Sequence, residues 1–362
     1  MENKKYWVAL NQFSKFGPLR FKKLLKYFQT AEQIFNAPIN EFKNAGIEES
    51  IAQEFISMRT KINPDQLWDN LEKENIKIVT INEDAYPKLL KEIHNPPALL
   101  YYKGKLEHDE YTLAVVGTRK CTSYGQQIVN DIVKKLISSN LTIVSGLALG
   151  IDTLAHSATL EARGRTISIL GTGLDKQSIY PVTNKYLADK IVSEGGCIFS
   201  EFPLGTPPLK HHFPQRNRII SGLSLGTLVI EAGERSGALI TAFLALEQNR
   251  EVFSVPGNIY SPVSAGPNKL IKLGAKTITS AEELIESLNL TQATEYIKTK
   301  EIVGETETEK KIIPHLDHEP KHVDELIRLT KLDTSTINST LTIMEMKGMV
   351  KNLGGMQYVL AR

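Results

Sequence analysis

The sequence predicts an α/β protein in which a mostly parallel sheet is covered by helices on both faces. Short apolar runs alternate with helical segments over residues 111–280, the pattern of parallel strands joined by crossover helices. Most of these runs end in a loop rich in small or polar residues. The flanking segments have helical patterns of their own. We therefore expect three domains, 1–62, 63–290 and 306–362, with residues 291–305 as a linker.

The composition is that of an ordinary globular protein. The 362 residues are 41% hydrophobic and 23% charged, and the net charge is only +2, so any surface that binds nucleic acid must be local. Two cysteines cannot form a disulfide framework, and no spacing of Cys and His resembles a zinc site. The chain begins MENKKYWVAL, without the apolar core of a signal peptide, and no apolar run is long enough to span a bilayer. We therefore expect a cytoplasmic protein.

Residues 1–62 have the pattern of a small helical domain. Apolar residues recur at helical spacing on both sides of Phe16-Gly17-Pro18, and a second pair of helices flanks Ala45-Gly46-Ile47. This is the layout of a helix-hairpin-helix or SAM-like domain, in which a glycine turn lets backbone amides approach a DNA phosphate. Ten Lys and Arg stand against six Asp and Glu in this segment. The alternative is a plain helical bundle whose lysines are only solvated.

One strand and an extended stretch precede the main sheet. Asn75–Ile81 is rich in Ile, Val and Thr and is expected to form a strand. Pro96 and Pro97 exclude a helix and favour an extended run. Six further strands are expected at Leu113–Val116, Leu141–Val144, Thr166–Leu170, Cys197–Ser200, Leu225–Ile230 and Val252–Val255. Residues 111–280 hold seventeen Lys and Arg against eleven Asp and Glu, so most of the positive charge is expected here.

The stretch Lys210–Ala242 carries the strongest functional signal. It begins with a cluster of basic and aromatic side chains: Lys210, His211, His212, Phe213, Arg216 and Arg218. Two arginines on either side of Asn217 suit a polyanion with stackable bases, hence a nucleotide or single-stranded nucleic acid. The alternative is a helix start whose arginines bridge to acids of the sheet.

The second half of this stretch is a strand followed by the start of a helix. Leu225–Ile230 is typical of a buried parallel strand, and Glu231–Gly237 follows it as a loop. Such loops, at the carboxyl ends of strands, are where open α/β sheets bind ligands. Backbone amides at the helix start, with Ser236 beside Gly237, would bind a phosphate.

Arg119 is a candidate in the loop after the first strand of the main sheet. It stands two residues after Gly117, so its guanidinium can reach a phosphate in the crevice. The alternative is a surface arginine paired with an acid. Ser123 and Gly125 are expected to shape the turn and cap the next helix.

The sequence does not support a cofactor, a metal or catalysis. Gly171 and Gly173 begin a dinucleotide motif, but Lys176 occupies the place of its third glycine. His211 and His212 are adjacent, point in different directions and have no recognisable further ligands. Several acids could act in acid–base chemistry, but caps, turns or ion pairs explain each of them: Asp152, Asp175, Glu201, Glu231 and Glu234.

Residues 306–362 have the pattern of a winged helix. Helices are expected at Ile312–Leu316, from His322 onward and over Thr334–Met346, followed by a two-stranded wing over Gly348–Leu360 with a Gly-Gly turn. From residue 305 onward eight Lys and Arg stand against nine Asp and Glu. A protein-interaction or accessory role is therefore at least as well supported as DNA binding through the third helix.

Seven motifs of the sheet segment, taken together and in order, resemble the DNA-processing protein A (DprA/Smf) family. They are Gly117-Thr-Arg-x4-Tyr-Gly125, Ser145-Gly-Leu-Ala-x-Gly-Ile-Asp152, Gly171-x-Gly-Leu-Asp-x4-Tyr-Pro181, Ser200-Glu-Phe-Pro-x-Gly205, Phe213-Pro-x-Arg-Asn-Arg218, Glu231-Ala-x3-Ser-Gly237 and Val255-Pro-Gly257. The flanking helical and winged-helix segments fit the three-part form of this family.

The resemblance implies an extended Rossmann-like domain that binds single-stranded DNA without catalysis. It also implies a homodimer and recruitment of the RecA recombinase during natural transformation, through surfaces at roughly residues 240–280. The DNA pocket implied by the resemblance maps onto Arg119, Lys210, Phe213, Arg216, Asn217, Arg218, Ser236 and Gly237, with Gly117, Ser145 and Gly146 as neighbours at the strand ends. We expect Arg119, Phe213, Arg218 and Ser236 to share one rim of the sheet.

Two other functions are left open by the sequence. Gly226–Glu231 is faintly similar to the nucleotide phosphoribohydrolases, Rossmann-like enzymes, although Leu223-Ser224-Leu225 replaces their Pro-Gly-Gly. A winged-helix transcription regulator is the other alternative, and it would prefer a defined duplex to oligo-dT.

Overall fold

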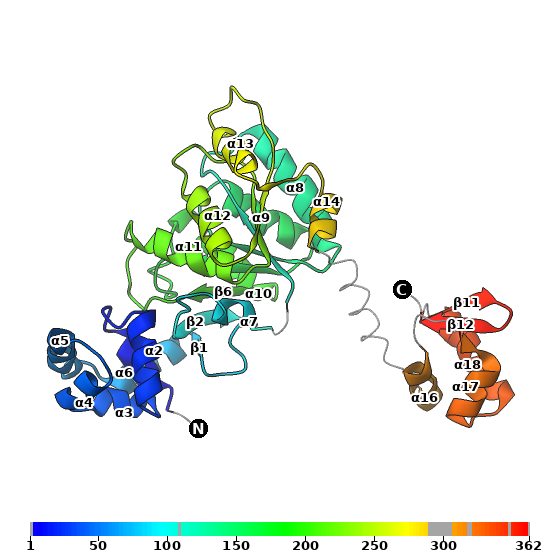
Figure 1. Cartoon of the computed structure of the whole chain (residues 1–362), viewed down its shortest axis with the longest axis horizontal. Coiled ribbons are helices and arrows are strands. Elements are labelled where there is room, and N and C mark those ends of the chain that lie inside the picture. The colour runs from blue at the N-terminus through cyan, green and yellow to red at the C-terminus, as the bar shows by residue number, and fades with distance from the viewer. Residues whose placement is uncertain (1–2, 108–109, 289–305, 317–320, 347–348, 361–362) are drawn as a thin grey trace. The chain divides into compact units, whose positions relative to one another are not determined.

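The computed structural model describes residues 3–107, 110–288, 306–316, 321–346 and 349–360 (Figure 1). The chain divides into two compact units, Met1–Leu284 and Ile285–Arg362. The first unit contains both the N-terminal helices and the sheet. The treatment of residues 1–62 as a domain of their own stays a prediction, and the predicted linker 291–305 lies outside the described residues.

Within the described residues, nine strands form one mostly parallel sheet, which confirms the predicted fold class. Their spatial order is β1 (Lys77–Thr80), β2 (Leu99–Gly104), β6 (Cys197–Ser200), β5 (Thr166–Leu170), β4 (Thr142–Ser145), β3 (Thr112–Val116), β7 (Gly226–Val229), β8 (Glu251–Ser254) and β9 (Lys276–Thr277). The pairs β1–β2 and β2–β6 are antiparallel and the others are parallel. Every residue of strands β3 to β7 is buried, so both faces of the central sheet are covered.

Two groups of helices pack on this sheet. One group is α8 (Ser123–Ile137), α9 (Ile151–Glu161) and α10 (Lys185–Ser193), preceded by the short turn η1 (Val182–Asn184). The other is α7 (Lys88–Lys91), α11 (His212–Gly222) and α12 (Gly237–Glu247). Two further helices are α13 (Ala265–Lys272) and α14 (Ala281–Ser287).

The order of the strands creates a switch point beside β3. From β3 the chain proceeds through β4 and β5 to β6 on one side, and then returns to β7, β8 and β9 on the other. The loops that follow β3 and β7 therefore leave the sheet in opposite directions. Ligands of open α/β sheets bind in the crevice that this divergence leaves.

In the described residues before β1 the chain forms six helices: α1 (Lys5–Asn11), α2 (Pro18–Tyr27), α3 (Ala31–Asn36), α4 (Ile39–Asn44), α5 (Glu49–Arg59) and α6 (Pro64–Lys73). Local signals set several of the boundaries. Pro18 and Pro64 occupy first turns, the Thr30 and Asn63 side chains cap α3 and α6, and Gly46 takes a φ of 76° between α4 and α5. Helix α1 packs on α6, α3 and β2 and so ties the bundle to the sheet. The helix-hairpin-helix or SAM-like assignment stays a prediction.

The second unit has the architecture of a winged helix, as predicted. Its elements are α16 (Glu307–Ile312), η2 (Ile313–His315), β10 (Lys321–His322), α17 (Val323–Thr330), α18 (Thr334–Met346), β11 (Val350–Gly354) and β12 (Gln357–Leu360). The strands form a sheet in the order β10-β12-β11. The core includes the fully buried side chains of Ile312, Leu326, Ile337, Leu341 and Met344.

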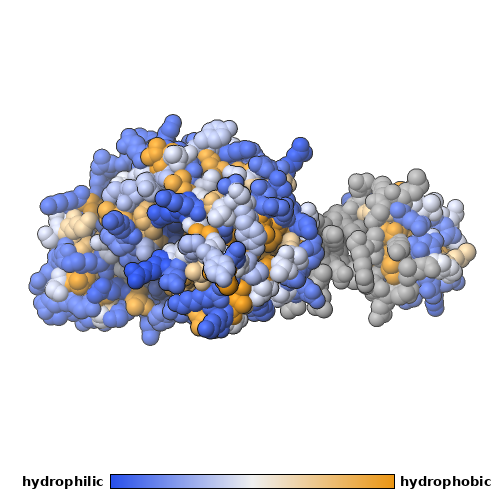
Figure 2. Space-filling model, turned by 90° about the horizontal axis from the view of Figure 1, so that it is seen from above, coloured by the Kyte–Doolittle hydropathy of each residue, from blue (hydrophilic) through white to orange (hydrophobic). Residues whose placement is uncertain are grey.

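The face of the molecule seen in Figure 2 carries many polar residues. On the face seen in Figure 2, apolar residues lie in small groups among polar ones. In the described part of the chain, none of the helices combines the length and the apolar character needed to cross a membrane.

Candidate functional site

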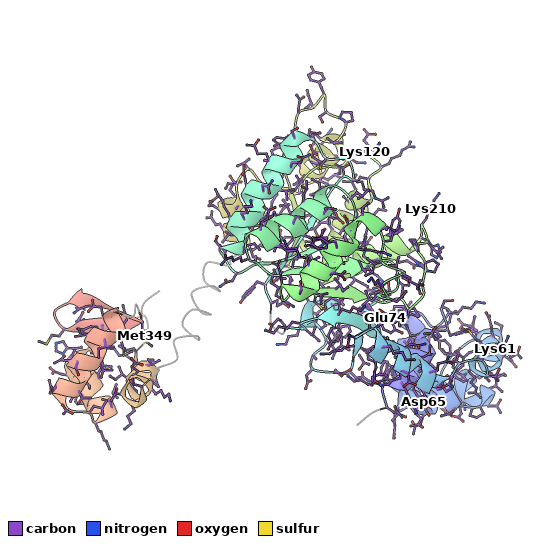
Figure 3. All side chains as sticks on the ribbon, turned by 180° about the vertical axis from the view of Figure 1, so that it is seen from behind. Lys61, Asp65, Glu74, Lys120, Lys210 and Met349 are labelled. Carbon is purple, nitrogen blue, oxygen red and sulfur yellow. The ribbon has the colours of Figure 1, made fainter. Side chains whose placement is uncertain are left out.

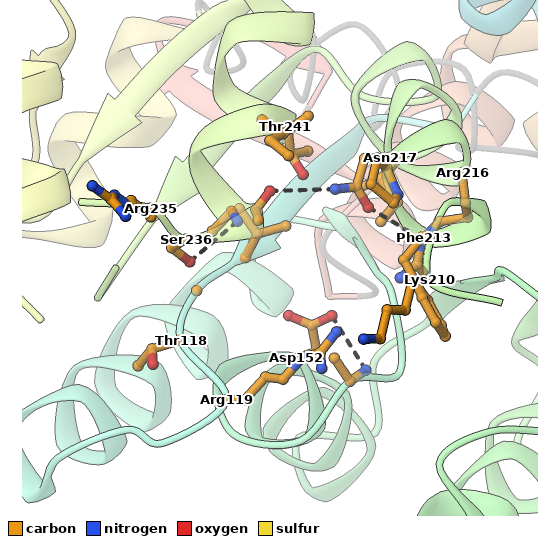
Figure 4. A pocket seen from close by; sticks show the side chains of 18 of the residues that line it. Thr118, Arg119, Asp152, Lys210, Phe213, Arg216, Asn217, Arg235, Ser236 and Thr241 are labelled. Carbon is orange, nitrogen blue, oxygen red and sulfur yellow. Dashed lines mark hydrogen bonds between the residues drawn. The ribbon is translucent and has the colours of Figure 1, made fainter. Parts of the chain in front are cut away.

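A cleft of about 920 Å³ opens at the switch point. Its walls come from the loop after β3, from the segment around Lys210 with the first turns of α11, and from the start of α12 (Figure 4). Segments that are far apart in the sequence thus meet at the carboxyl ends of β3 and β7. This is the rim of the sheet at which the sequence predicted a ligand site.

The start of α12 forms one wall. Ser236 is the residue before the helix, and its side-chain oxygen accepts the backbone N–H of Ala238 at 3.3 Å. The first turn of α12 carries no acidic residue, so its free N–H groups and the helix dipole remain favourable to an anion. The Asn217 amide donates to the carbonyl oxygen of Gly237 at 3.3 Å and links α11 to this helix start.

An arginine and an aromatic ring face each other across the cleft. The Arg119 guanidinium carbon lies 5.9 Å from the centre of the Phe213 ring, within the range of a cation–π contact. The Tyr180 ring lies 6.0 Å from that of Phe213, tilted by 49°. The site therefore combines a charge that suits phosphate with flat apolar surfaces that suit a base.

Three exposed cations surround the cleft: Arg119, Lys210 and Arg235. Among the residues that the structure describes, none of the three has an ion-pair partner. Their charge is therefore available to a ligand.

Arg216 lines the cleft but is largely a structural residue. Only 4% of it is exposed, and its Nη1 donates to the carbonyl oxygens of Gly146, at 2.7 Å, and Ile169. Burial lowers the pKa of Arg216 to about 10, against the opposing effect of the nearby Asp152 carboxyl. The guanidinium thus joins the ends of two strands while adding charge to the floor of the cleft.

Asp152 is the acidic group in the lining. Its carboxylate accepts the backbone N–H groups of Gly146 and Ala148 at 3.1 and 3.3 Å. Burial raises the pKa of Asp152, and the neighbouring Arg216 works in the opposite direction. These bonds fix the loop after β4.

The three predicted neighbours at the strand ends support the cleft in different ways. Gly117 lines it, and a Cβ there would lie 2.5 Å from the Ile151 side chain. Ser145 is buried and donates to the carbonyl oxygen of Val115 at 2.7 Å. Gly146 lies behind the lining, where a Cβ would lie 2.6 Å from the Arg216 guanidinium. Ser145 and Gly146 therefore hold the wall in place without forming its surface.

Arg218 does not share the cleft with the other predicted residues, which corrects the expectation that it would. It is 8% exposed, forms an ion pair with Glu201 and lines a different hollow. The reason is helical geometry. Arg218 lies two residues after Arg216, which lines the cleft, and residues two apart in an α-helix point about 200° apart around its axis. The ion pair between Arg218 and Glu201 is of the kind that the sequence analysis gave as the alternative, an arginine of this helix bridging to an acid. Arg119, Phe213 and Ser236 do lie together.

Arg235 and Thr241 are lining residues that the sequence analysis did not single out. Arg235 directly precedes Ser236, so the loop position alone could have identified it. Thr241 lies one helical turn after Gly237 and is recognisable only once the face of α12 that borders the cleft is known.

Glu231 and His212, which the sequence analysis also considered, pack against or bond to neighbouring residues of the fold. Glu231 accepts the backbone N–H of Thr122 at 2.8 Å as well as its hydroxyl hydrogen. His212 is buried against Phe202, with ring centres 4.1 Å apart. In the described part of the chain, no group of three or more His, Cys, Asp and Glu side chains could hold a metal ion.

Two family models match the chain. The model described as DNA recombination-mediator protein A matches residues 77–289, and the model of the DprA winged helix domain matches residues 298–356.

Individual proteins are similar over much of the length. Protein Smf of Synechocystis is 36% identical over 98% of both chains. The X-ray structure of DNA processing protein A from Streptococcus pneumoniae has a TM-score of 0.67 and 37% identity, over 79% of this chain and 98% of that one. DNA processing protein A from Helicobacter pylori, whose structure is described as showing a single-stranded DNA binding mode, has a TM-score of 0.52 and 28% identity, over 59% and 95%.

Proposed function

The chain belongs to the DNA recombination-mediator protein A (DprA/Smf) family, and we propose that it binds single-stranded DNA in the cleft between α11 and α12 and loads RecA onto it during natural transformation. The observation that carries the proposal is that Arg119, Lys210 and Arg235, which have no acidic partners among the described residues, line the same cleft as the ring of Phe213. The single-stranded DNA binding described for the Helicobacter pylori relative supports it.

Each part of the cleft has a role in this proposal. The cations and the N–H groups at Ser236–Gly237 bind phosphates, and Phe213 stacks on a base, a contact worth about 1–3 kcal/mol per base. Asn217 and Arg216 hold α11 against the other walls. A single strand can turn its bases into such a cleft, whereas a duplex keeps them paired and stacked. Binding is therefore expected to be largely independent of sequence and sensitive to salt.

Other parts of the proposal rest on the family. They are the homodimer, the contact with RecA, a role without catalysis, and the cytoplasmic location. Exposed apolar side chains between residues 240 and 280 support an interaction surface there: Phe243, Leu246, Ile259, Tyr260 and Leu273. A dimer would hold two clefts on one strand and raise the effective affinity.

The test is binding of labelled oligo-dT measured by fluorescence anisotropy at two salt concentrations. We expect Arg119→Ala and Phe213→Ala each to weaken binding by about 5- to 150-fold, which corresponds to about 1–3 kcal/mol. Both side chains line the cleft, so thermal unfolding should change little. Lys61→Ala, an exposed lysine on the N-terminal helices, is the matched control. Wild-type dissociation constants for both cleft variants would refute the proposed site.

The enzyme alternative has no specific support from the site. Glu231, the acid that would follow the strand in a phosphoribohydrolase, is 2% exposed and bonded to Thr122. Release of free base from common nucleoside monophosphates would nevertheless establish that activity. A preference for a defined duplex over oligo-dT would establish the transcription-regulator alternative.

A further inference from the structure

A second hollow lies beside α11 in the same compact unit. It measures about 630 Å³ and lies between the sheet and the N-terminal helices, with Asn11, His211, His212, Gln215 and Arg218 in its lining. Two smaller hollows of about 370 and 420 Å³ share Pro18 and Asn95 with it. We call the three together the junction groove.

One short segment separates the cleft from the junction groove. Pro208, Lys210, Phe213 and Asn217 line the cleft, whereas Pro207, His211, His212, Gln215 and Arg218 line the groove. Lys210 and His211 are consecutive, so their Cα atoms are about 3.8 Å apart. A polymer that leaves the cleft beside Lys210 therefore enters the groove after crossing this one segment.

The charge of the groove suits a polyanion. Lys22 and Lys26 lie one turn apart on α2, and Lys91 ends α7. All three are exposed, and among the described residues none of them has an ion-pair partner. The acids of the lining are already neutralised, because Glu201 pairs with Arg218 and Glu48 with Arg20.

Two mostly buried polar side chains with unused hydrogen-bonding atoms border the groove. Arg218 and His212 are each 8% exposed, and among the described residues the Nη1 of Arg218 and the Nδ1 of His212 have no hydrogen-bond partner. Phe202 and His212 stack with an angle of 24° between their planes. A flat aromatic pair beside unused hydrogen-bonding groups is suited to a nucleobase.

We propose that the junction groove holds the continuation of the single strand that enters the cleft, with phosphates on Lys22, Lys26 and Lys91 and a base beside the Phe202–His212 pair. This inference rests on the proposed function. It gives the N-terminal helices a direct part in DNA binding, through one face of α2. A strand long enough to reach both sites would bind more tightly than one that fills the cleft alone.

The experiment compares two lengths of oligo-dT, about 6 and about 20 nucleotides, because sites of this kind cover about 4–16 nucleotides. The variant is Lys22→Ala/Lys26→Ala/Lys91→Ala in the full chain. We expect its affinity for the longer strand to fall about tenfold or more, and its affinity for the shorter strand to stay at the wild-type value. Loss of three phosphate contacts should also reduce the slope of log K against log salt by about 2 for the longer strand.

The control variant is Lys61→Ala/Lys73→Ala/Lys77→Ala, which removes the same charge from exposed lysines outside the groove (Lys61 is labelled in Figure 3). It should bind both lengths like the wild type. Equal losses in the two triple variants, or none in either, would overturn the groove. If the wild type and Arg119→Ala bind the short strand equally, the proposed cleft itself fails. If Arg119→Ala weakens binding of the short strand while the groove variant binds both lengths like the wild type, the cleft stands and the groove does not.

Discussion

Arg216, Asn217 and Arg218 are consecutive, yet their side chains have different partners and lie on two sides of α11. Arg216 joins strand ends by bonding to carbonyl oxygens, and Asn217 holds the start of α12. Arg218 pairs with Glu201 in the junction groove. The sequence identified the cluster because basic residues gathered there. It could not separate their roles, since which face of the helix points to the cleft depends on packing against the sheet.

The ion pair of Arg218 leads to a prediction about stability. Arg218→Ala leaves the mostly buried Glu201 carboxylate without its partner, which is expected to cost about 3–5 kcal/mol of unfolding free energy. Adding Glu201→Gln removes the stranded charge and should recover part of this loss. Urea unfolding of the two single variants and the double variant measures the coupling. Fully additive losses would show that the pair does not act as described.

His156 predicts how stability depends on pH. Its Nδ1 lies 2.7 Å from Thr166 Oγ1, and its Nε2 has no partner among the described residues. Burial, together with the charge of Arg216, lowers the pKa of His156 to about 3. Below a pH of about 6.5 the histidine takes up a proton in the unfolded chain but stays neutral in the folded protein. The free energy of unfolding is therefore highest above that pH and falls as the pH falls. Between pH 7 and pH 5 the loss should be about 2 kcal/mol.

The control for this prediction is His156→Gln, which cannot titrate. Urea unfolding at pH 7 and pH 5 should show the wild type losing about 2 kcal/mol more than the variant. Equal losses in the two proteins would mean that the ring is not held neutral.

At the scale of elements, the strands were predictable wherever they are buried. All six strands expected in the main sheet are present. Short β-branched and apolar runs bounded by small residues are typical of buried strands. Strand β9 was missed, since Lys276 and Thr277 are exposed and polar. The meeting of the loops after β3 and β7 could be anticipated from the switch-point rule, whereas the contribution of Thr241 depended on how α12 is rotated.

The contact between these two loops gives the next prediction. Glu231→Ala removes two hydrogen bonds to Thr122 and so releases the loop that carries Arg119. We expect faster amide hydrogen exchange at residues 118–122 and binding of oligo-dT weaker by about 1 kcal/mol, although Glu231 does not line the cleft. Glu231→Gln, which keeps an acceptor there, should show a smaller effect. Unchanged exchange in the alanine variant would contradict this role.

At the scale of the whole molecule, the charges considered for DNA binding lie in the unit Met1–Leu284. The winged-helix architecture was predictable from three helical patterns and a Gly-Gly turn. Its partner was not predictable, because residues 305–362 have nearly balanced charge.

Removal of residues 289–362 is therefore expected to leave oligo-dT affinity unchanged to within about threefold, since no cation of the cleft is lost. Anisotropy titrations of the shortened and complete chains at matched salt make the comparison. A loss of tenfold or more, with a smaller salt slope, would show that the second unit binds the strand directly.

The double connection between Glu231 and the loop after β3 has a geometric consequence. The Glu231 carbonyl oxygen accepts the Thr118 N–H at 2.6 Å, while its side chain accepts from Thr122. Glu231 therefore holds both ends of the loop 118–122, which carries Arg119, against the segment that leads to Ser236. Arg216 and Asn217 hold α11 against the other walls in the same way, so the folded chain sets the spacing between the anion-binding positions of the cleft before a ligand arrives.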